Sequence, residues 1–218
     1  MNTSLLLQLF KDTLLLIPCS KTKQPGSEPS NALSILLALD PARAAALANA
    51  RAALLDKARV DDRTLMPAYL RYSGELYKHG STGIGEAVAA GQKALIVSGG
   101  YGLLLADEPI GMYEKPFTRS DWPSGLLEGC ILDYAHREGI RSVIAVMART
   151  TDYAKLIRRV NWGGAGLEAT LVSPVAHGGG AAGKVPRAQG QAVAALINTG
   201  LDQAWRSSDS LSLETESL

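Results

Sequence analysis

The sequence predicts a three-layer α/β/α fold around a central, mostly parallel sheet of four strands. Four short aliphatic runs recur along the 218 residues, and segments of helical composition separate them. Pro or Ser follows three of the runs, as is typical where a strand ends in a loop. Strands that alternate with helices form right-handed crossovers, and the helices then cover both faces of the sheet. The predicted strands are 14–17, 94–97, 142–147 and 167–172.

The first strand leads into the segment that carries the most chemical groups. Residues 14–17 are consecutive aliphatics, a pattern typical of a strand that is buried on both faces. Pro18 ends this strand because proline cannot donate to a central ladder. Residues 19–23 bring a thiol, two hydroxyls and two ammonium groups to the carboxyl edge of the sheet. Open α/β folds bind their ligands at that edge.

A helical insertion over about 31–79 separates the first two strands. Asp40 and Pro41 suit the N-cap and the first turn of a helix, and the Ala-rich run 42–60 has high helix propensity. Another helix is predicted over 66–77. The insertion could form a cap over the carboxyl edge of the sheet.

The rest of the chain completes a single domain. A glycine-rich turn, 98–102, follows the second strand, and the polar, proline-broken stretch 107–116 is predicted to be irregular. Gly139 is placed to close a helix at its C′ position. The helices predicted after the insertion are 83–90, about 124–138, 151–160 and 186–206. We predict one α/β domain over 1–206 and a disordered, Ser- and Glu-rich tail over 207–218.

The composition excludes several classes of protein. Hydrophobic residues make up 46% of the chain and charged residues 20%, which predicts a soluble globular protein. The net charge of +1 gives no global basic signal, so contact with a nucleic acid would need a local patch. Cys19 and Cys130 form neither a disulfide framework nor a zinc site, which favours a reducing cytoplasm, and we expect no metal and no cofactor. No apolar run reaches the roughly 18 residues that a membrane span requires.

Lys21 and Lys23 are the first candidates for chemistry. A lysine at a partly desolvated strand end has a depressed pKa and can attack an electrophilic carbon or bind phosphate. The alternative is a pair of solvated loop lysines. Cys19 could be a thiolate nucleophile if a base lies nearby, and His177 is the one histidine expected at the same edge. A packed, inert cysteine is the alternative for Cys19.

Backbone amides and carboxylates follow the second strand. The glycine-rich turn offers its amides to an anion or to the edge of a base, although such turns are common in α/β folds. Asp107 and Glu108 come close behind, and carboxylates near a lysine can polarise a water or stabilise a developing cation. The alternative for this pair is a helix cap or a surface ion pair.

The segment 178–184 follows the last strand and fits the start of a phosphate-binding loop, G-x-x-x-x-G-K. Val185 stands where that motif has Ser or Thr, so the magnesium ligand is missing. Lys184 and Arg187 could still bind a nucleic-acid phosphate, and a flexible hinge is the alternative. His177 is followed by glycines and could contact a phosphate or a leaving base, although a lone histidine is more often structural.

Several of these segments, in their order along the chain, resemble motifs of the YaaA-like bacterial proteins. The motifs are PCSKTK at 18–23, LY at 76–77, SGGYGLL at 98–104 and DEPIGMY at 107–113. The resemblance covers about 14–117. Gly99 and Gly100 stand where that family has a small residue and a lysine, and residues 112–114 replace its Pro-Tyr-Asp.

The segment 18–23 is also similar to the P-C-x-x-x-K motif of the archaeosine synthase core. In that family the lysine attacks the modified base of tRNA, and Lys23 occupies the matching position, although Gln24 and Pro25 replace the family's Pro-Tyr. Both families look related to the uracil-DNA-glycosylase type of fold, which reads an extruded base at the carboxyl edge of a four-stranded parallel sheet. Some prokaryotic relatives are glycosylases that remove hypermodified bases in anti-phage defence.

The resemblance implies a cytoplasmic DNA glycosylase that removes a modified base from phage DNA. Asp107 or Glu108 would act on the sugar side, and His177 with the amides of 99–102 would act on the base side. Lys23 would attack the sugar carbon or hold a phosphate. Other contacts to the substrate are expected from Cys19, Ser20, Lys21, Ser98, Gly99, Gly100, Tyr101 and Tyr113, and contacts to phosphates from Lys184, Arg187 and Arg158.

Alternatives to the glycosylase stay open. A DNA-binding oxidative-stress protein of YaaA type would bind DNA without catalysis, and a lysine-dependent transferase would modify the base. A Rossmann-like enzyme would bind a free nucleotide through 178–184. Tyr101, Tyr113 and Trp122 could stack on an extruded base or could belong to the core. The glycosylase requires the loops 18–30 and 98–117 to lie at one edge of the sheet.

Overall fold

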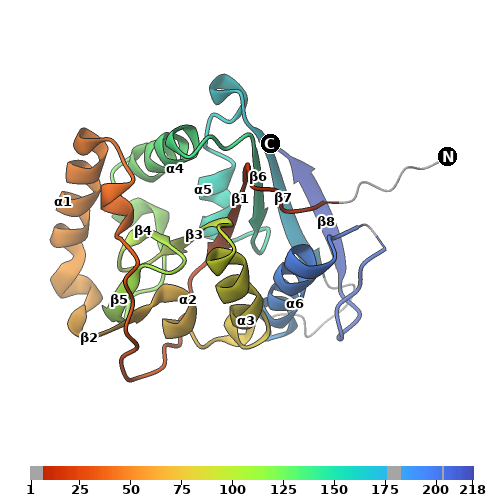
Figure 1. Ribbon diagram of the computed structural model, residues 1–218, viewed down its shortest axis with the longest axis horizontal. Helices are drawn as coiled ribbons and strands as arrows, with labels where there is room; N and C mark the ends of the chain where they lie inside the picture. Colours follow the sequence, from red (N-terminus) through yellow and green to blue (C-terminus); the bar gives the residue numbers. More distant parts are fainter. Residues whose placement is uncertain (1–6, 176–182, 203) are drawn as a thin grey trace.

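The computed structural model describes residues 7–175, 183–202 and 204–218 and has an α/β fold (Figure 1). Its central sheet has six strands in the order β4-β3-β1-β6-β7-β8. The inner four strands pair in parallel and coincide with the four strands that the sequence predicts. They are β1 (Thr13–Pro18), β3 (Lys93–Ser98), β6 (Ser142–Val146) and β7 (Glu168–Val175).

The sheet is larger than the predicted four strands and is mixed, because an antiparallel strand lies at each edge. β4 (Gly102–Leu105) turns back on β3 directly after the glycine-rich turn. β8 (Ser212–Ser217) pairs with β7 at the other edge, so the prediction of a disordered tail is wrong. Side chains alternate between the two faces of β8. Leu213 packs against the core, while the carboxylates of Glu214 and Glu216 pair with arginines.

Alternate side chains of β1 enter two separate cores, one on each face of the sheet. Leu14 and Leu16 pack with residues of α1, α4 and α5, whereas Leu15 and Ile17 pack with residues of α3 and α6. Figure 1 shows α3 and α6 side by side over one face. These helices are α1 (Pro41–Ala58), α3 (Glu75–Ala89), α4 (Leu126–Arg137), α5 (Asp152–Ile157) and α6 (Lys184–Asn198). Burial on both faces explains why β1 lacks the alternation of a half-exposed strand.

The insertion between β1 and β3 is only partly helical. As predicted, α1 begins after Asp40, whose carboxylate accepts a hydrogen bond from the Ala42 N–H at 2.9 Å. The predicted helix over 66–77 is instead divided between the end of a strand, the short helix α2 (Ala68–Arg71) and the start of α3.

A second, two-stranded sheet accounts for the other departures from the prediction. β2 (Asp61–Pro67) pairs antiparallel with β5 (Pro109–Met112), a segment predicted to be irregular. The side chain of Arg71 is fully buried between them and donates to the carbonyls of Gln24, Thr64 and Ile110. The two strands lie far apart in the sequence, so no local pattern reveals their pairing.

The ends of two helices show where local signals succeed and fail. α4 ends at Arg137 and Gly139 follows with a φ of +67°, which confirms the predicted closing glycine. α6 ends at Asn198, before the predicted residue 206, because the chain turns at Gly200 and pairs Leu201 with Leu7. Within the described ranges, every helix is too short or too polar to cross a bilayer.

Candidate functional site at the carboxyl edge

The carboxyl edge of the parallel strands contains a topological switch point. From β1 the chain passes through α3 to β3 on one side, and later through α4 to β6 on the other side of β1. Helices α3 and α4 therefore lie on opposite faces of the sheet. Such a reversal leaves a crevice outside the carboxyl ends of the strands, which is where doubly wound folds bind ligands.

A cavity of about 940 Å³ opens at this edge, a size suited to a nucleotide-sized ligand. Four segments line it: the loop 18–22 after β1, the start of α3 with Lys78, the segment from Ala148 to Tyr153 after β6, and the first turns of α6 with Gln189. Of the insertion over 31–79, only residues at and just before the start of α3 line the cavity, because α1 packs on α4 instead. The insertion therefore does not cap the cavity as the sequence suggested.

Cys19 lies in a group of tyrosine hydroxyls at the end of β1. Its backbone N–H donates to the Val97 carbonyl at 2.9 Å, and its thiol lies 3.1 Å from the Tyr153 hydroxyl. The thiol also interacts with the Tyr113 hydroxyl, which is 2.8 Å from the Tyr72 hydroxyl. Burial raises the pKa of Tyr72, Tyr113 and Tyr153 well above the ordinary value. These hydroxyls therefore stay protonated at neutral pH and can donate hydrogen bonds.

Lys23 lies over the ring of Tyr113, the same tyrosine whose hydroxyl contacts the Cys19 thiol. Its Nζ lies 3.6 Å from the ring centroid of Tyr113 and 5.9 Å from that of Tyr72, and it donates to the Lys21 carbonyl at 3.3 Å. A backbone bridge to Tyr72 fixes this part of the loop. Desolvation lowers the pKa of the Lys23 ammonium, while the charges of Cys19 and Glu114 act in the opposite direction. The structure thus brings two potential nucleophiles, Cys19 and Lys23, to one aromatic ring.

Asp107 and Glu108 lie near the amino ends of the parallel strands, opposite to the carboxyl edge that holds the cavity. The predicted pairing of these carboxylates with Lys23 is therefore not formed. β4 runs antiparallel to β3, and the register places Leu105 opposite Leu95, near the amino end of β3. The Asp107 carbonyl accepts from the Ser30 hydroxyl at 3.2 Å. The reversal of direction in β4 carries both carboxylates away from the cavity.

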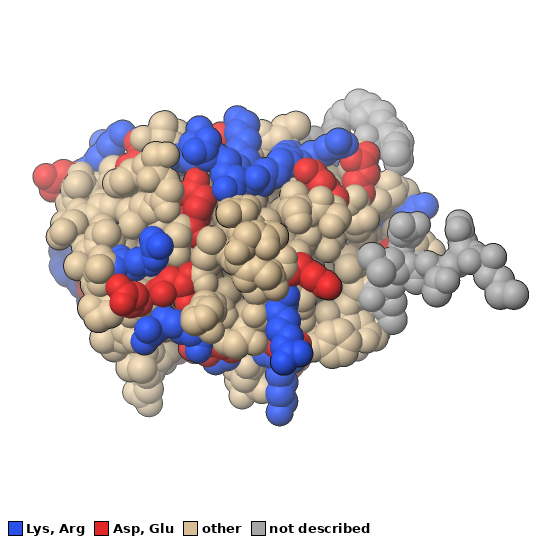
Figure 2. All heavy atoms as spheres, turned by 90° about the horizontal axis from the view of Figure 1, so that it is seen from above, with Lys and Arg blue, Asp and Glu red and all other residues tan. Residues whose placement is uncertain are grey.

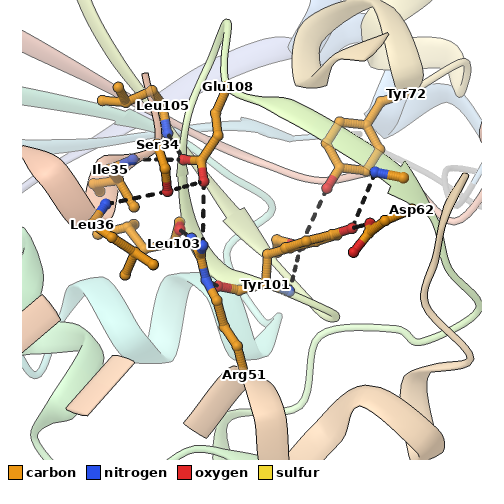
Figure 3. A network of polar contacts seen from close by, with 12 residues as sticks. Ser34, Ile35, Leu36, Arg51, Asp62, Tyr72, Tyr101, Leu103, Leu105 and Glu108 are labelled. Atoms are coloured by element: carbon orange, nitrogen blue, oxygen red, sulfur yellow. Dashed lines mark hydrogen bonds and ion pairs between the residues drawn. The ribbon is translucent and has the colours of Figure 1, made fainter. Parts of the chain in front are cut away.

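Glu108 has a structural role that uses both carboxylate oxygens (Figure 3). Its side chain is buried and accepts from the Ser34 hydroxyl at 2.6 Å, the Ile35 N–H at 3.0 Å and the Leu105 N–H at 3.1 Å. Arg51 forms an ion pair with it at 3.2 Å and donates to two carbonyls of the turn and β4. Glu108 therefore joins α1, the 34–36 turn and β4.

The glycine-rich turn also packs internally. A Cβ on Gly99 would overlap the Lys115 carbonyl, and one on Gly100 would lie 2.7 Å from the Tyr113 ring. Ser98 is buried, and its hydroxyl accepts from the Tyr101 N–H at 3.1 Å. The glycines are thus required by the close approach of residues 113–117, and this accounts for them without a ligand.

Of the predicted aromatic stacking residues, Tyr113 and Trp122 are buried and Tyr101 is half-buried and held by hydrogen bonds. The Tyr101 hydroxyl donates to Asp62 at 2.6 Å and accepts from the Gly111 N–H at 3.1 Å. Phe117, which stacks on Tyr153 at a centroid distance of 4.9 Å, returns the chain to the cavity side. Residues near both ends of the loop 98–117 therefore lie beside the start of the 18–30 loop, while its middle lies at the amino end of β3, where the Asp107 carbonyl accepts from Ser30.

The predicted phosphate ligands are mostly engaged elsewhere. Arg158 pairs with Glu216 of β8, and Arg187 pairs with Glu75 and Asp209. Lys184 is exposed at the start of α6, Lys21 is exposed on the lining of the cavity, and Ser20 lines it as well. His177 and the glycines 178–180 lie outside the described residues. On the face in Figure 2, positive and negative side chains are interspersed, with the largest group of Lys and Arg along one margin.

The sequence did not reveal several residues of the cavity, among them Tyr153, Lys78 and Gln189. Tyr153 follows the third predicted strand, where its position at the carboxyl edge was the available signal. Lys78 and Gln189 lie on helices without any motif. Gln189 is 4% exposed, and its Nε2 has no hydrogen-bond partner within the part of the chain that the structure describes. In that same part, no three His, Cys, Asp or Glu side chains are grouped to hold a metal ion.

Comparison with known proteins found no matching family model, no matching curated protein and no matching solved structure. The relation to the YaaA-like proteins and to the archaeosine synthase core therefore stays a prediction based on the motifs.

Proposed function

We propose that the protein is an enzyme that breaks the N-glycosidic bond of a modified nucleotide, with Lys23 as the attacking amine. The observation that carries this proposal is the position of the Lys23 Nζ, 3.6 Å from the ring centroid of Tyr113, whose hydroxyl contacts the thiol of the cavity-lining Cys19. The motif similarity to the archaeosine synthase core supports the same residue, because Lys23 matches the nucleophilic lysine of that family. The uracil-DNA-glycosylase type of fold is part of this proposal.

The lowered pKa of Lys23 favours the reaction because only the neutral amine is a nucleophile. The amine attacks the sugar C1′, the C1′–N bond breaks, and the base leaves with the electron pair and takes a proton from water. The lysine nitrogen gives one proton to the hydroxide left by that water and its other proton to O4′ as the sugar ring opens to an imine, and a second water hydrolyses the imine to the free amine and the open-chain aldehyde. The Tyr153 hydroxyl at the cavity wall can donate a hydrogen bond to the charge on the leaving base.

The amine route fits the site better than direct attack by a water. Activation of a water on the sugar side requires a free carboxylate, and Asp107 and Glu108 are at the other edge of the sheet. Glu75 lines the cavity but pairs with Lys78 and Arg187, which hold the pKa of its carboxyl below the ordinary value. An amine nucleophile needs no such base once it is neutral.

The test is to incubate the protein with DNAs that carry different base modifications, including heavily modified phage DNA, and with the corresponding free nucleotides. Mass spectrometry follows released bases, and borohydride traps the imine as a protein–sugar adduct. Lys23→Ala should lose release and trapping. Lys11→Ala, an exposed lysine before the amino end of β1, is the matched control and should keep both.

The outcomes separate the alternatives. Release without trapping that survives Lys23→Ala would remove the lysine mechanism. Tight DNA binding with no release would favour the non-enzymatic DNA-binding protein. Release from free nucleotides alone would identify them, instead of DNA, as the substrate, and no release from any source would overturn the proposal.

A further inference from the structure

The amino-terminal ends of α3 and α6 meet at the cavity. Gly74 precedes α3 and Gly183 precedes α6, and neither helix has a side-chain cap. The cavity is lined by residues 74–76 at the start of α3 and by residues 183, 185 and 186 at the start of α6. The first N–H groups of a helix have no partner within the helix, and the helix dipole places positive charge there. Two such ends on one cavity favour an anionic ligand.

Close packing of small residues brings the two helix ends together. A Cβ on Gly190 would overlap the Leu76 carbonyl, and one on Gly80 would lie 3.5 Å from the Gly190 carbonyl. At the other side of α3, a Cβ on Gly74 would overlap the Ser20 hydroxyl of the loop after β1. The absence of these side chains lets α3, α6 and the 18–22 loop converge on one end of the cavity.

Gln189 supplies an independent sign of a ligand at this place. It lies in the second turn of α6, lines the cavity and is 4% exposed. Its Nε2 has no acceptor within the described ranges, although a buried donor is ordinarily paired. An acceptor oxygen on a bound ligand would satisfy this donor.

The charges that line the cavity have the matching sign. Lys21 and Lys78 lie on its lining, and Lys78 pairs with Glu75 at 2.7 Å. Glu75 also pairs with Arg187 at 3.2 Å, so two cations offset its single negative charge. Lys21 then adds to the positive ends of the two helices, and a phosphate is the anion that such a combination of ammonium and backbone N–H groups binds well.

We infer that this end of the cavity binds the phosphate of a nucleotide, with Gln189 Nε2 as a donor to one phosphate oxygen. The identification of the phosphate as part of a nucleotide depends on the proposed function. The phosphate would lie at α3 and α6, so the sugar and base would extend toward Cys19 and Tyr153, which line the same cavity.

Calorimetric titrations with inorganic phosphate, ribose 5-phosphate and ribose test this inference. Ribose 5-phosphate should bind at least about tenfold more tightly than ribose, as expected for a group held by helix ends and charged side chains. Gln189→Glu should weaken binding of both phosphates by about tenfold or more, because it replaces the donor by a negative charge. Gln191→Glu, on the same helix but paired with Ser208, carries the same charge change and should stay within about twofold.

A second measurement on the unaltered protein guards against a variant that fails to fold. The amide resonances of Glu75, Leu76 and Lys184 should shift when phosphate is added. Equal binding of ribose and ribose 5-phosphate, equal losses in the Gln189 and Gln191 variants, or unmoved amides would each overturn the inference. Phosphate binding without base release would keep this site and remove the proposed reaction. Base release with the same KM for phosphorylated and unphosphorylated substrates would keep the proposed reaction and remove the phosphate site.

Discussion

The amino and carboxyl edges of the central sheet differ in the hydrogen-bond partners of their buried polar groups. At the amino edge, the Glu108 carboxylate has a hydroxyl, two backbone N–H groups and a guanidinium as partners. At the carboxyl edge, the buried Gln189 amide nitrogen has none within the described part of the chain. Glu108 therefore follows the general rule that buried polar groups have hydrogen-bond partners, whereas Gln189 departs from that rule.

The same contrast applies to the charged groups that the sequence made candidates for catalysis. Glu108 is closed to substrate because its partners surround it. Lys23 is held against tyrosine rings, which stabilise its ammonium less well than water does, and desolvation lowers its pKa. A buried charge with a full set of polar partners contributes to stability, whereas Lys23 has one backbone carbonyl and tyrosine rings as partners, so the two edges should respond differently to substitution.

The largest expected effect is on stability, at the amino edge. Glu108→Gln leaves the largely buried Arg51 guanidinium, whose side chain is 13% exposed, without its counter-charge and should lower the free energy of unfolding by about 3 kcal/mol. Urea unfolding measures this loss. Asp107→Asn, at the preceding and half-buried residue, is the control and should cost less than about 1 kcal/mol. Base release per folded molecule should not change in either variant. A loss of release in Glu108→Gln alone would indicate that this carboxylate takes part in the reaction.

The second effect concerns the turn that connects the two edges. Gly99→Ala places a Cβ against the Lys115 carbonyl, and a forced shift of packed backbone should cost about 2 kcal/mol. Gly163→Ala has open space around the added Cβ and an ordinary φ, so its unfolding free energy should change by less than about 0.5 kcal/mol. Thermal unfolding compares them. Equal stability of the two variants would mean that the turn has room for a ligand after all.

The third prediction uses pH to examine the carboxyl edge. The folded protein lowers the pKa of Lys23, so between that pKa and the ordinary lysine pKa the unfolded chain binds more protons than the folded one. Stability should therefore rise with pH through this window. Lys23→Met should remove this rise in urea titrations at several pH values. The rate of base release should increase over the same window, and a rate that falls with rising pH would contradict a neutral amine nucleophile.

The sequence was a good guide to the parallel core and to the edge that holds the cavity. Runs such as 14–17 are buried on both faces in any surroundings, so composition alone locates them. Pro18 then marks the strand end and places Cys19 at the carboxyl edge. The antiparallel strands were missed because their partners are remote: β5 needs β2, and β8 needs β7.

Individual site residues were harder to predict than the edge itself. Asp107 and Glu108 were assigned to the wrong edge because nothing within the residues of β4 indicates its direction. Gln189 has no local signature, since its burial depends on the contact between α3 and α6. The motif at 18–23 identified part of the cavity lining, residues 18–22, because it combines a strand end with polar groups, and that combination requires no knowledge of tertiary contacts.

The smallest effect is expected at Arg158, which the sequence offered as a phosphate ligand. Its guanidinium donates to both carboxylate oxygens of Glu216, at 2.7 to 3.1 Å, and holds the pKa of that carboxyl below the ordinary value. Because both side chains are partly exposed, Arg158→Ala should cost less than about 1 kcal/mol.

The pH dependence of this pair has the opposite sign to that of a buried amine. A depressed carboxyl pKa stabilises the folded protein above the ordinary Glu pKa, and the contribution disappears as the pH falls through the lowered value. Glu216→Gln should therefore differ from the unaltered protein in urea titrations at neutral pH but not in strong acid. Binding of ribose 5-phosphate should be unchanged in Arg158→Ala, because this arginine fastens β8 to α5 and lies outside the lining of the cavity. A loss of phosphate binding in that variant would show that the anion site extends to β8, beyond the ends of α3 and α6.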